Sequence, residues 1–183
     1  MKRINFFSDI VKLYHDPENQ KLAFAIVPDE IKSLGGIPQI KALLAWFKQD
    51  FFTWVDKPVA CPTCGTNKEM ESLPDETPSE EELKFRASRV EVYKCKTCSL
   101  DVRYPRFNHP VKLYETRRGR CGEWANAFTS ICVALGHNSR MVLDWTDHVW
   151  TEIWVPELER WVHMDSCENS FDQPLLYEDG WGK

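Results

Sequence analysis

The chain has 183 residues, of which 43% are hydrophobic, 28% charged and 13% aromatic, including 8 Trp. This composition is typical of a globular protein with one domain, or one domain and a small satellite, and it excludes a disordered chain. The formal net charge of −5 argues against an extended nucleic-acid-binding surface, which would be basic.

The hydrophobic segments are too short for a transmembrane helix. The longest uninterrupted one is Ala42 to Phe47, whereas a helix that crosses a bilayer needs about 20 apolar residues. Near the amino terminus, Asp9 and Lys12 interrupt the segment that would form the core of a secretory leader. We therefore expect neither a membrane span nor secretion.

The first part of the chain is predicted to be helical. A short helix is expected around Phe6 to Tyr14, and Gly35-Gly36 marks a break. From Ile37 to about Val55, apolar residues recur every three or four positions, which predicts an amphipathic helix that Pro58 stops. Its apolar stripe is expected to face the core rather than a ligand; it consists of Ile40, Leu43, Leu44, Phe47, Phe51 and Trp54.

Two Cys-x-x-Cys pairs follow, Cys61/Cys64 and Cys95/Cys98. Together they supply the four thiolates of a closed, tetrahedral structural zinc site, which is the interpretation we favour. Two disulfides or a redox-active pair are the alternatives. A redox motif needs only one pair, and no secretory leader supports disulfides. Between the pairs lies an acidic, polar loop, and Val90 to Tyr93 is predicted to be a strand that leads into the second pair.

The other cysteines are Cys121, Cys132 and Cys167, which bring the total to 7. An odd number cannot pair completely within the chain, and no Asn-x-Ser/Thr glycosylation sequon is present. Both observations indicate a reducing compartment, the cytoplasm or also the nucleus.

The strongest helix signal begins near Cys121. The residues on one face are Cys121, Trp124, Ala125, Phe128, Cys132 and Leu135. Gly119 and Gly122 bracket the first turn, so the helix is expected to begin at or just before Cys121. Gly136 is suited to the left-handed position that ends a helix.

After this helix the hydrophobic period changes to two, which predicts a hairpin. We expect strands from His148 to Val155 and from Arg160 onward, joined by a turn at Pro156 to Glu159. Pairing Val155 with Arg160 gives the facing pairs Trp154–Trp161, Glu152–His163 and Trp150–Asp165. His148 then lies diagonal to Asp165 on the same face, about 7–8 Å away at the backbone, which is within reach of a His and a carboxylate.

These placements predict a Cys-His-Asp triad. Cys121 at a helix N-terminus would be the nucleophile, and His148 would take its proton and later protonate the leaving amine. Asp165 would accept a hydrogen bond from the other imidazole nitrogen and fix the tautomer. Backbone N–H groups around Cys121 would help to hold an oxyanion.

The thiol must ionise in order to attack, and a free thiol has a pKa of about 8.5. We expect the helix N-terminus to lower the pKa of Cys121, with the help of Arg117, Arg118 and Arg120. The alternative for a single cysteine on an apolar helix face is a core position, which is the interpretation we give to Cys132. His163 is expected to be structural.

Several segments resemble the cytoplasmic peptide:N-glycanases of the transglutaminase-like superfamily. They are RRGRCGEWANAF, DHVWTEIW and WVHMDSCE, together with WFKQDFFTW, RYPRFNHPVKLYETR, FDQPLLYEDGWGK and the two cysteine pairs. The resemblance covers about Trp46 to Lys183. The double Cys-x-x-Cys upstream of this string is specific to the glycanases, whereas short Cys/His/Asp motifs also occur in transglutaminases and some proteases.

The resemblance implies an α+β fold with a transglutaminase-like, papain-like core and an inserted zinc-binding lobe. Residues 1–58 would be the N-terminal helical part of the core, 59–105 the zinc lobe and 106–183 the catalytic core. The family's catalytic residues fall on Cys121, His148 and Asp165. Its zinc ligands fall on Cys61, Cys64, Cys95 and Cys98, which would hold one structural Zn²⁺.

Substrate contacts are also implied by the resemblance. Glu168 matches a residue that contacts the chitobiose core of the glycan, and Arg140, Trp150, Glu152 and Trp161 match positions important to the active cleft. The alternatives are that the two tryptophans pack between sheet and helix, and that Arg140 and Glu152 form a structural ion pair. For Trp54 a place in the cleft is the alternative, but we expect it to be core.

The implied activity is removal of N-linked glycans from misfolded glycoproteins, in support of ER-associated degradation. The amide between the Asn side chain and the proximal N-acetylglucosamine is cleaved, which leaves Asp. Implied partners are unfolded N-glycosylated proteins, a ubiquitin-like-domain shuttle protein and the proteasome. Family members continue beyond the position of Lys183 with further strands, so we expect the strand that carries Asp165 to lack a neighbour.

Two alternatives to a glycanase remain. One is another enzyme that uses the same triad, a transglutaminase or a thiol protease, against which the zinc pairs argue. The other is an inactive transglutaminase-like module that binds nucleic acid; the presence of all triad residues and the negative net charge argue against it.

Overall fold

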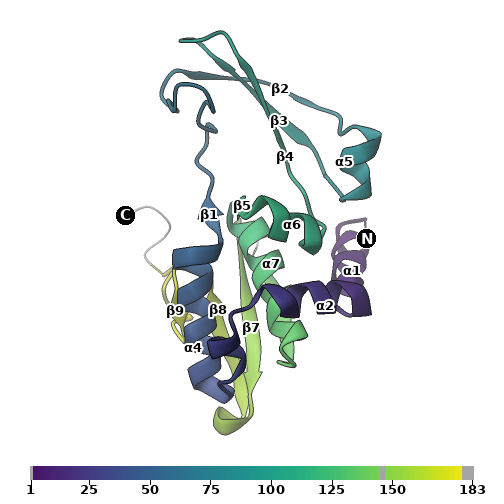
Figure 1. Cartoon of the computed structure of the whole chain (residues 1–183), viewed down its shortest axis with the longest axis vertical. Coiled ribbons are helices and arrows are strands. Elements are labelled where there is room, and N and C mark those ends of the chain that lie inside the picture. The colour runs from purple at the N-terminus through teal and green to yellow at the C-terminus, as the bar shows by residue number, and fades with distance from the viewer. Residues whose placement is uncertain (1, 145–146, 179–183) are drawn as a thin grey trace.

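The structure is a computed structural model that describes residues 2–144 and 147–178. It is an α+β fold in which a lobe built on one sheet projects from a larger core (Figure 1). The helices are α1 (Lys2–Tyr14), α2 (Pro17–Ile26), α3 (Asp29–Lys32), α4 (Gly36–Trp46), η1 (Phe47–Phe51), α5 (Glu80–Lys84), α6 (Pro110–Thr116), α7 (Cys121–Ala134) and η2 (Pro156–Leu158). The strands are β1 (Thr53–Trp54), β2 (Met70–Glu76), β3 (Val90–Cys95), β4 (Asp101–Pro105), β5 (Arg118–Gly119), β6 (Ser139–Asp144), β7 (His148–Val155), β8 (Arg160–Asp165) and β9 (Ser170–Phe171).

Helix α7 is the centre of the core. It begins at Cys121, as predicted, because the Glu123 carboxylate accepts the backbone N–H of Arg120 at 3.0 Å and so caps the first turn. It ends before Gly136, whose φ of +86° is the left-handed conformation expected for that position. From Glu123 to Cys132 every side chain is buried. The helix is therefore enclosed on all sides, not on one face only.

One side of α7 packs against the antiparallel sheet β6-β7-β8-β9. The predicted register is confirmed: Val155 pairs with Arg160, and the further pairs are Trp154–Trp161 and Glu152–His163. Thr151 points toward α7, where its hydroxyl meets that of Thr129 at 2.7 Å. Since side chains alternate along a strand, His148 and Glu152 lie on the opposite face of β7.

The strand that carries Asp165 does have a second neighbour, contrary to our expectation. Asp165 pairs with Ser170 and Met164 with Phe171, so β9 covers the end of β8. The expectation failed because the chain turns back after Asp165 within a few residues, without needing more distant strands. The last part of the FDQPLLYEDGWGK segment, 179–183, lies outside the described residues.

The predicted helix from Ile37 to Val55 is shorter than expected. α4 passes into the π-helical turn η1, which ends at Phe51, and Thr53–Trp54 then forms β1. β1 pairs in parallel with β5, with Thr53 opposite Arg118 and Trp54 opposite Gly119. This pairing places the chain that follows α4 and η1 beside Arg118 and Gly119, which lead directly into Cys121.

The lobe consists of the sheet β2-β3-β4, helix α5 and the two cysteine pairs; we call it the cysteine lobe. The predicted strand at Val90 is confirmed as β3, the middle strand of this sheet. The lobe has a small hydrophobic cluster of its own, which consists of Val55, Val59, Cys61, Met70, Tyr93, Cys95 and Tyr104. The main core cluster lies around α4, η1, α7 and the larger sheet.

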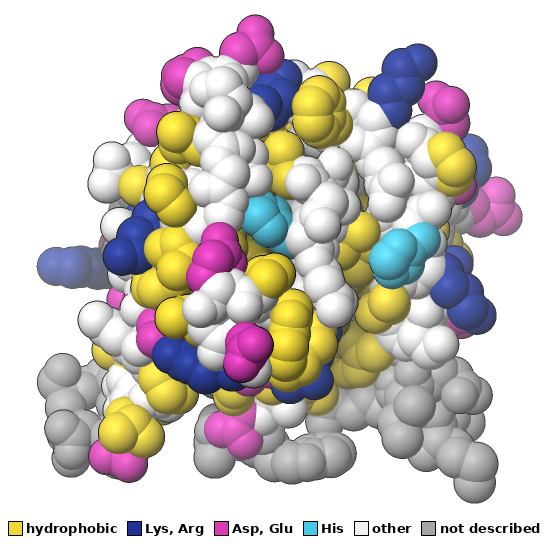
Figure 2. Space-filling view, turned by 90° about the horizontal axis from the view of Figure 1, so that it is seen from below, with side chains coloured by type: hydrophobic (Ala, Val, Ile, Leu, Met, Phe, Trp, Pro, Cys, Tyr) yellow, Lys and Arg dark blue, Asp and Glu magenta, His cyan; other side chains and the backbone are white. Residues whose placement is uncertain are grey.

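The end of the molecule away from the cysteine lobe is shown in Figure 2. Acidic and basic side chains are both present there, with hydrophobic side chains between them. Among the helices of the described ranges, none has the length and hydrophobicity that a bilayer span requires.

Phe47 is central to the aromatic packing that holds η1 on α7, and it is fully buried. Its ring lies 5.5 Å from that of Trp124 and 5.3 Å from that of Phe128, in edge-to-face contacts. We expect Phe47→Ala to lower the free energy of unfolding by about 3–5 kcal/mol, since it leaves a cavity. Phe24→Ala is the control, because Phe24 is 47% exposed; it should cost about 0.5 kcal/mol or less. Chemical denaturation measures both, and similar losses would contradict this view of the core.

Candidate active site and metal centre

Cys121, the first residue of α7, is half-buried and lines a cavity of about 220 Å³. The other lining residues are Trp54, Asp147, His148, Cys167 and Glu168. The predicted nucleophile and the predicted base therefore face one cavity, although they are separated along the chain by α7 and β6. β5 lies directly before the helix, and its pairing with β1 fixes the approach of the chain to Cys121.

His148 and Asp165 are paired as predicted. His148 Nε2 lies 2.8 Å from Asp165 Oδ2, and both residues are almost completely buried. Since a carboxylate only accepts hydrogen bonds, Nε2 carries the proton and donates it to Asp165. This bond fixes the orientation of the imidazole at the edge of the cavity.

Asp165 is held by several further donors. The backbone N–H of Cys167 reaches Oδ1 at 2.8 Å, and the Tyr177 hydroxyl donates to Oδ2 at 2.6 Å. Burial on its own would raise the pKa of Asp165, but the hydrogen bonds from His148, Tyr177 and Cys167 hold it below the usual value. Asp165 thus remains a carboxylate, the form that can orient His148.

Sequence reasoning did not identify Tyr177 as part of this site. Its hydroxyl also lies 2.7 Å from His163 Nε2, so it joins His163 to Asp165. Because the Tyr177 hydroxyl donates its proton to Asp165, His163 is the donor to Tyr177. This contact agrees with the structural role expected for His163. The only signal in the sequence was the Tyr in the resemblance segment PLLYE.

The pKa of Cys121 differs from our expectation. Burial raises the pKa of the thiol, and the carboxylates of Glu123 and Asp147 act in the same direction, while the Gly122 backbone N–H and Arg106 oppose them. These effects favour the thiol form of Cys121 over the thiolate.

The three arginines before Cys121 each contact another group, and the charge of Arg120 is paired with a carboxylate. The guanidinium of Arg117 lies 4.9 Å from the Phe51 ring centroid, and that of Arg118 lies 5.8 Å from Tyr104. Arg120 forms an ion pair with Glu91 at 2.8 Å. The sequence places these charges near Cys121, but only the fold decides where they point.

The predicted substrate-binding residues fall into two groups. Glu168 lines the cavity of Cys121, and the Trp150 ring stacks on His148 at a centroid distance of 5.9 Å. Arg140, Glu152 and Trp161 form a cluster of their own: the Arg140 guanidinium pairs with Glu152 at 2.5 Å and lies 4.0 Å from the Trp161 ring centroid. The ion pair weighed as an alternative is thus present.

Trp54 is not part of the core, contrary to our prediction. It is 48% exposed and lines the cavity of Cys121. The prediction was wrong because it continued the helical period past Phe51, where the chain changes to the strand β1.

The four cysteines of the two pairs come together in the cysteine lobe. Their sulfur atoms all lie within 4.8 Å of one another. The distance between Cys61 and Cys98 is 3.4 Å, and that between Cys64 and Cys95 is 3.5 Å. Zn–S bonds of about 2.3 Å in a tetrahedron place the sulfurs about 3.8 Å apart. The four thiols therefore fit a tetrahedral metal ion.

The backbone prepares this cluster for a cation. The N–H of Cys64 lowers the pKa of the Cys61 thiol to about 6, against the effect of desolvation. The N–H of Cys98 lowers the pKa of Cys95 in the same way. The pKa of the second cysteine of each pair is raised instead, for Cys98 chiefly by the hydrogen bond with the Cys95 thiol. The thiolate is the form that binds a metal.

Comparison with known proteins agrees with this geometry. The family model described as "Transglutaminase-like superfamily" matches residues 71–166, just over half of the chain. A rat protein named peptide-N(4)-(N-acetyl-beta-glucosaminyl)asparagine amidase is 46% identical over 194 residues, which cover 94% of this chain and 29% of the rat protein.

Two further relatives with the same name come from Caenorhabditis elegans and Candida glabrata. They are 44% and 50% identical, over 96% and 79% of this chain and 30% and 41% of their own lengths. This chain thus spans less than half of the length of each of these three relatives. Because the family model covers more than half of the chain and the relatives align along most of it, the chain belongs to the transglutaminase-like superfamily.

Proposed function

We propose that this chain hydrolyses the amide between an Asn side chain and the proximal N-acetylglucosamine of an N-linked glycan. One observation carries the proposal: Cys121 at the start of α7 and His148, which is hydrogen-bonded to Asp165, line one cavity. The printed names of the relatives, which describe an amidase of this linkage, support the choice of substrate.

In the first step, the Cys121 thiol gives its proton to His148, and the sulfur attacks the carbonyl carbon of the linkage amide. The negative charge on the carbonyl oxygen is stabilised by backbone N–H groups at the start of α7, which have no partner within the helix. The C–N bond then breaks. The glycosylamine leaves with the proton from His148, and a thioester to Cys121 remains.

In the second step, His148 takes a proton from water, whose oxygen attacks the thioester. The C–S bond breaks, the sulfur recovers a proton, and Asp remains in the peptide. The released glycosylamine hydrolyses to the free glycan and ammonia. Asp165 keeps the imidazole oriented throughout and stabilises the imidazolium that forms in each step.

The space around Cys121 supports a linkage with a large group on either side. Cys121 also lines a second cavity, of about 260 Å³, between α1, α7 and the cysteine lobe. A glycan and a peptide must both extend from the reacting amide, so room on more than one side is required. Because Cys121 is half-buried, the peptide must be able to bend into the cleft, which favours unfolded N-glycosylated proteins as substrates.

We propose Zn²⁺ as the metal held by Cys61, Cys64, Cys95 and Cys98. Four thiolates suit zinc and leave no position for a substrate, so the ion would cross-link the cysteine lobe and take no part in the reaction. On the resemblance alone we also propose a role in ER-associated degradation, a cytoplasmic or also nuclear location, and a ubiquitin-like-domain shuttle protein and the proteasome as partners.

Removal of the nucleophile tests the reaction. We expect Cys121→Ala to reduce glycan release from a denatured high-mannose glycopeptide by about 10⁴-fold or more, as happens when a catalytic nucleophile is lost. Mass spectrometry measures the free glycan and the conversion of Asn to Asp. Cys132→Ala is the matched control: Cys132 is fully buried in the core, away from the cavity, and its loss should leave the reaction intact.

The same experiment separates the other functions. Amine incorporation into a peptide would indicate a transglutaminase, and cleavage of the peptide backbone a thiol protease. A folded, metal-loaded chain that does none of these and is unaffected by Cys121→Ala would overturn the proposed function.

The metal is tested by its stoichiometry. We expect about one zinc ion per chain by elemental analysis, and loss of that ion in Cys64→Ser, because a hydroxyl is a poor replacement for a thiolate. Removal of zinc should also lower the melting temperature, since ion binding is coupled to folding of the lobe. Cys132→Ala should retain the ion. Equal zinc in the wild type and Cys64→Ser would contradict the assignment.

A further inference from the structure

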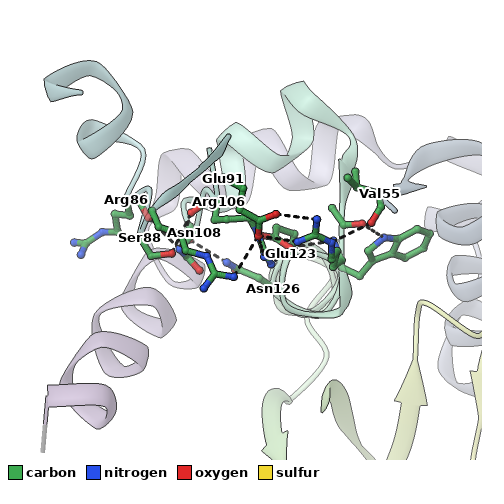
Figure 3. Close-up of polar contacts among 12 residues, drawn as sticks. Val55, Arg86, Ser88, Glu91, Arg106, Asn108, Glu123 and Asn126 are labelled. Carbon is green, nitrogen blue, oxygen red and sulfur yellow. Dashed lines mark hydrogen bonds and ion pairs between the residues drawn. The ribbon is translucent and has the colours of Figure 1, made fainter. Parts of the chain in front are cut away.

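A buried network of charged side chains connects the cysteine lobe to the start of α7 (Figure 3). It contains two carboxylates, Glu91 on β3 and Glu123 on α7, and two guanidinium groups, those of Arg106 and Arg120. Glu91 has no role in the proposed mechanism. Glu91 is the only one of the four that belongs to a strand of the lobe sheet.

Glu91 is 4% exposed, and its carboxylate binds both of these arginines and also the more exposed Arg89, whose Nη2 lies 3.2 Å from Oε1. Arg120 approaches in a bidentate manner, with Nη1 at 2.8 Å from Oε1 and Nη2 at 2.9 Å from Oε2. Arg106 Nη1 donates to Oε1 at 2.8 Å, and the Tyr93 hydroxyl donates to Oε2 at 2.6 Å. Bidentate pairs of this kind fix the geometry of both side chains.

Arg120 is the residue immediately before Cys121, so its position determines where the first turn of α7, and with it the Cys121 side chain, lies. Besides Glu91, its Nε donates to the carbonyl of Val55 at 3.2 Å. Its own backbone N–H is bound by Glu123. The side chain and the backbone of Arg120 are therefore both fixed, one by the lobe and the segment after β1, the other by α7.

Arg106 completes the connection by a second route. Its Nε and Nη2 donate to the two oxygens of Glu123 at 2.6 and 2.8 Å, while its Nη1 remains on Glu91. Glu123 is 5% exposed, so its charge depends on this partner. Loss of one member of a buried ion network leaves the others uncompensated, and they rearrange.

We propose that Glu91 is a positioning residue for Cys121, which it holds in place through Arg120 directly and through Arg106 and Glu123. The role rests on Cys121 being the nucleophile of the proposed function. Glu91 itself touches no substrate. Its contribution is to keep the first turn of α7 where the Cys121 sulfur can give its proton to His148.

The test is Glu91→Gln, which preserves the size of the side chain and removes its charge. Glu82→Gln is the matched control. Glu82 also belongs to the cysteine lobe and also forms a bidentate pair, with Arg103 at 2.8 and 3.2 Å, but that pair does not reach α7. Alkylation of Cys121 by iodoacetamide is followed by peptide mapping, which separates Cys121 from the other cysteines. Zinc content, melting temperature, kcat and KM are measured beside it.

We expect alkylation of Cys121 and kcat to fall about tenfold in Glu91→Gln, with KM changed less than about twofold, because positioning of the nucleophile affects the chemical step. Glu82→Gln should match the wild type in these rates. A purely structural role would lower the melting temperature and leave alkylation unchanged. Alkylation of Cys121 in Glu91→Gln at the wild-type rate, or slowed no more than in Glu82→Gln, would overturn the proposal.

If Glu91→Gln does not fold, Arg120→Lys takes its place. Lysine keeps the charge but its single ammonium cannot bind both Glu91 oxygens and the Val55 carbonyl, so the same slowing is expected. Alkylation requires no substrate. A wild-type chain that is alkylated at Cys121 but releases no glycan would therefore refute the proposed function, while the comparison of variants would still decide the role of Glu91.

Discussion

Complete burial of α7 is the constraint on which the rest of the structure depends. Helices, the larger sheet and the aromatic side chains of η1 surround it, so its axis and its ends have little freedom. A catalytic cysteine needs its backbone fixed within a fraction of an ångström, and a helix on a surface would not provide that. At the first turn of α7, Cys121 lines the cavity that His148 also lines. Core packing and placement of the nucleophile are thus the same physical problem.

Enclosing the helix also buries its polar groups, and the fold satisfies them in ways that contribute to the site. Glu123 cannot be left without a partner, and its position in the first turn brings Arg106 and, through it, Glu91 to the start of the helix. Gly119 is required here because a Cβ would lie 2.2 Å from the Glu123 side chain. The cysteine lobe is joined to α7 by charges that would be costly to separate. A metal ion that orders the lobe would therefore affect the site indirectly, by stabilising the lobe that carries Glu91.

The electrostatics of the site favour a neutral resting nucleophile. Burial and two nearby carboxylates raise the pKa of Cys121, whereas Asp165 remains ionised because it accepts hydrogen bonds from His148, Tyr177 and the backbone. The two groups differ in what stabilises their charged forms: Asp165 accepts several hydrogen bonds, and Cys121 has the Gly122 N–H and the charge of Arg106. In the proposed mechanism, proton transfer to His148 is then the step that creates the thiolate. Activation of the Cys121 thiol then depends mainly on the orientation of the His148 imidazole, which Asp165 and Trp150 hold in place.

The sequence by itself determined the features that depend on residues close to one another along the chain. The apolar periodicity and the flanking glycines located the start of α7. The turn at Pro156 to Glu159 predicted the hairpin register, and the period of two placed His148 and Asp165 on one face of the sheet. The spacing of the cysteines predicted a cluster, which the structure forms. Tertiary structure alone decided what depends on distant neighbours. Trp54 lies outside the core because the helix ends before it and β1 begins. The three arginines contact Glu91 and aromatic rings, and Tyr177 donates a hydrogen bond to Asp165. No pattern along the chain records which buried charge a long side chain will reach, since that choice is made only when all the elements are packed.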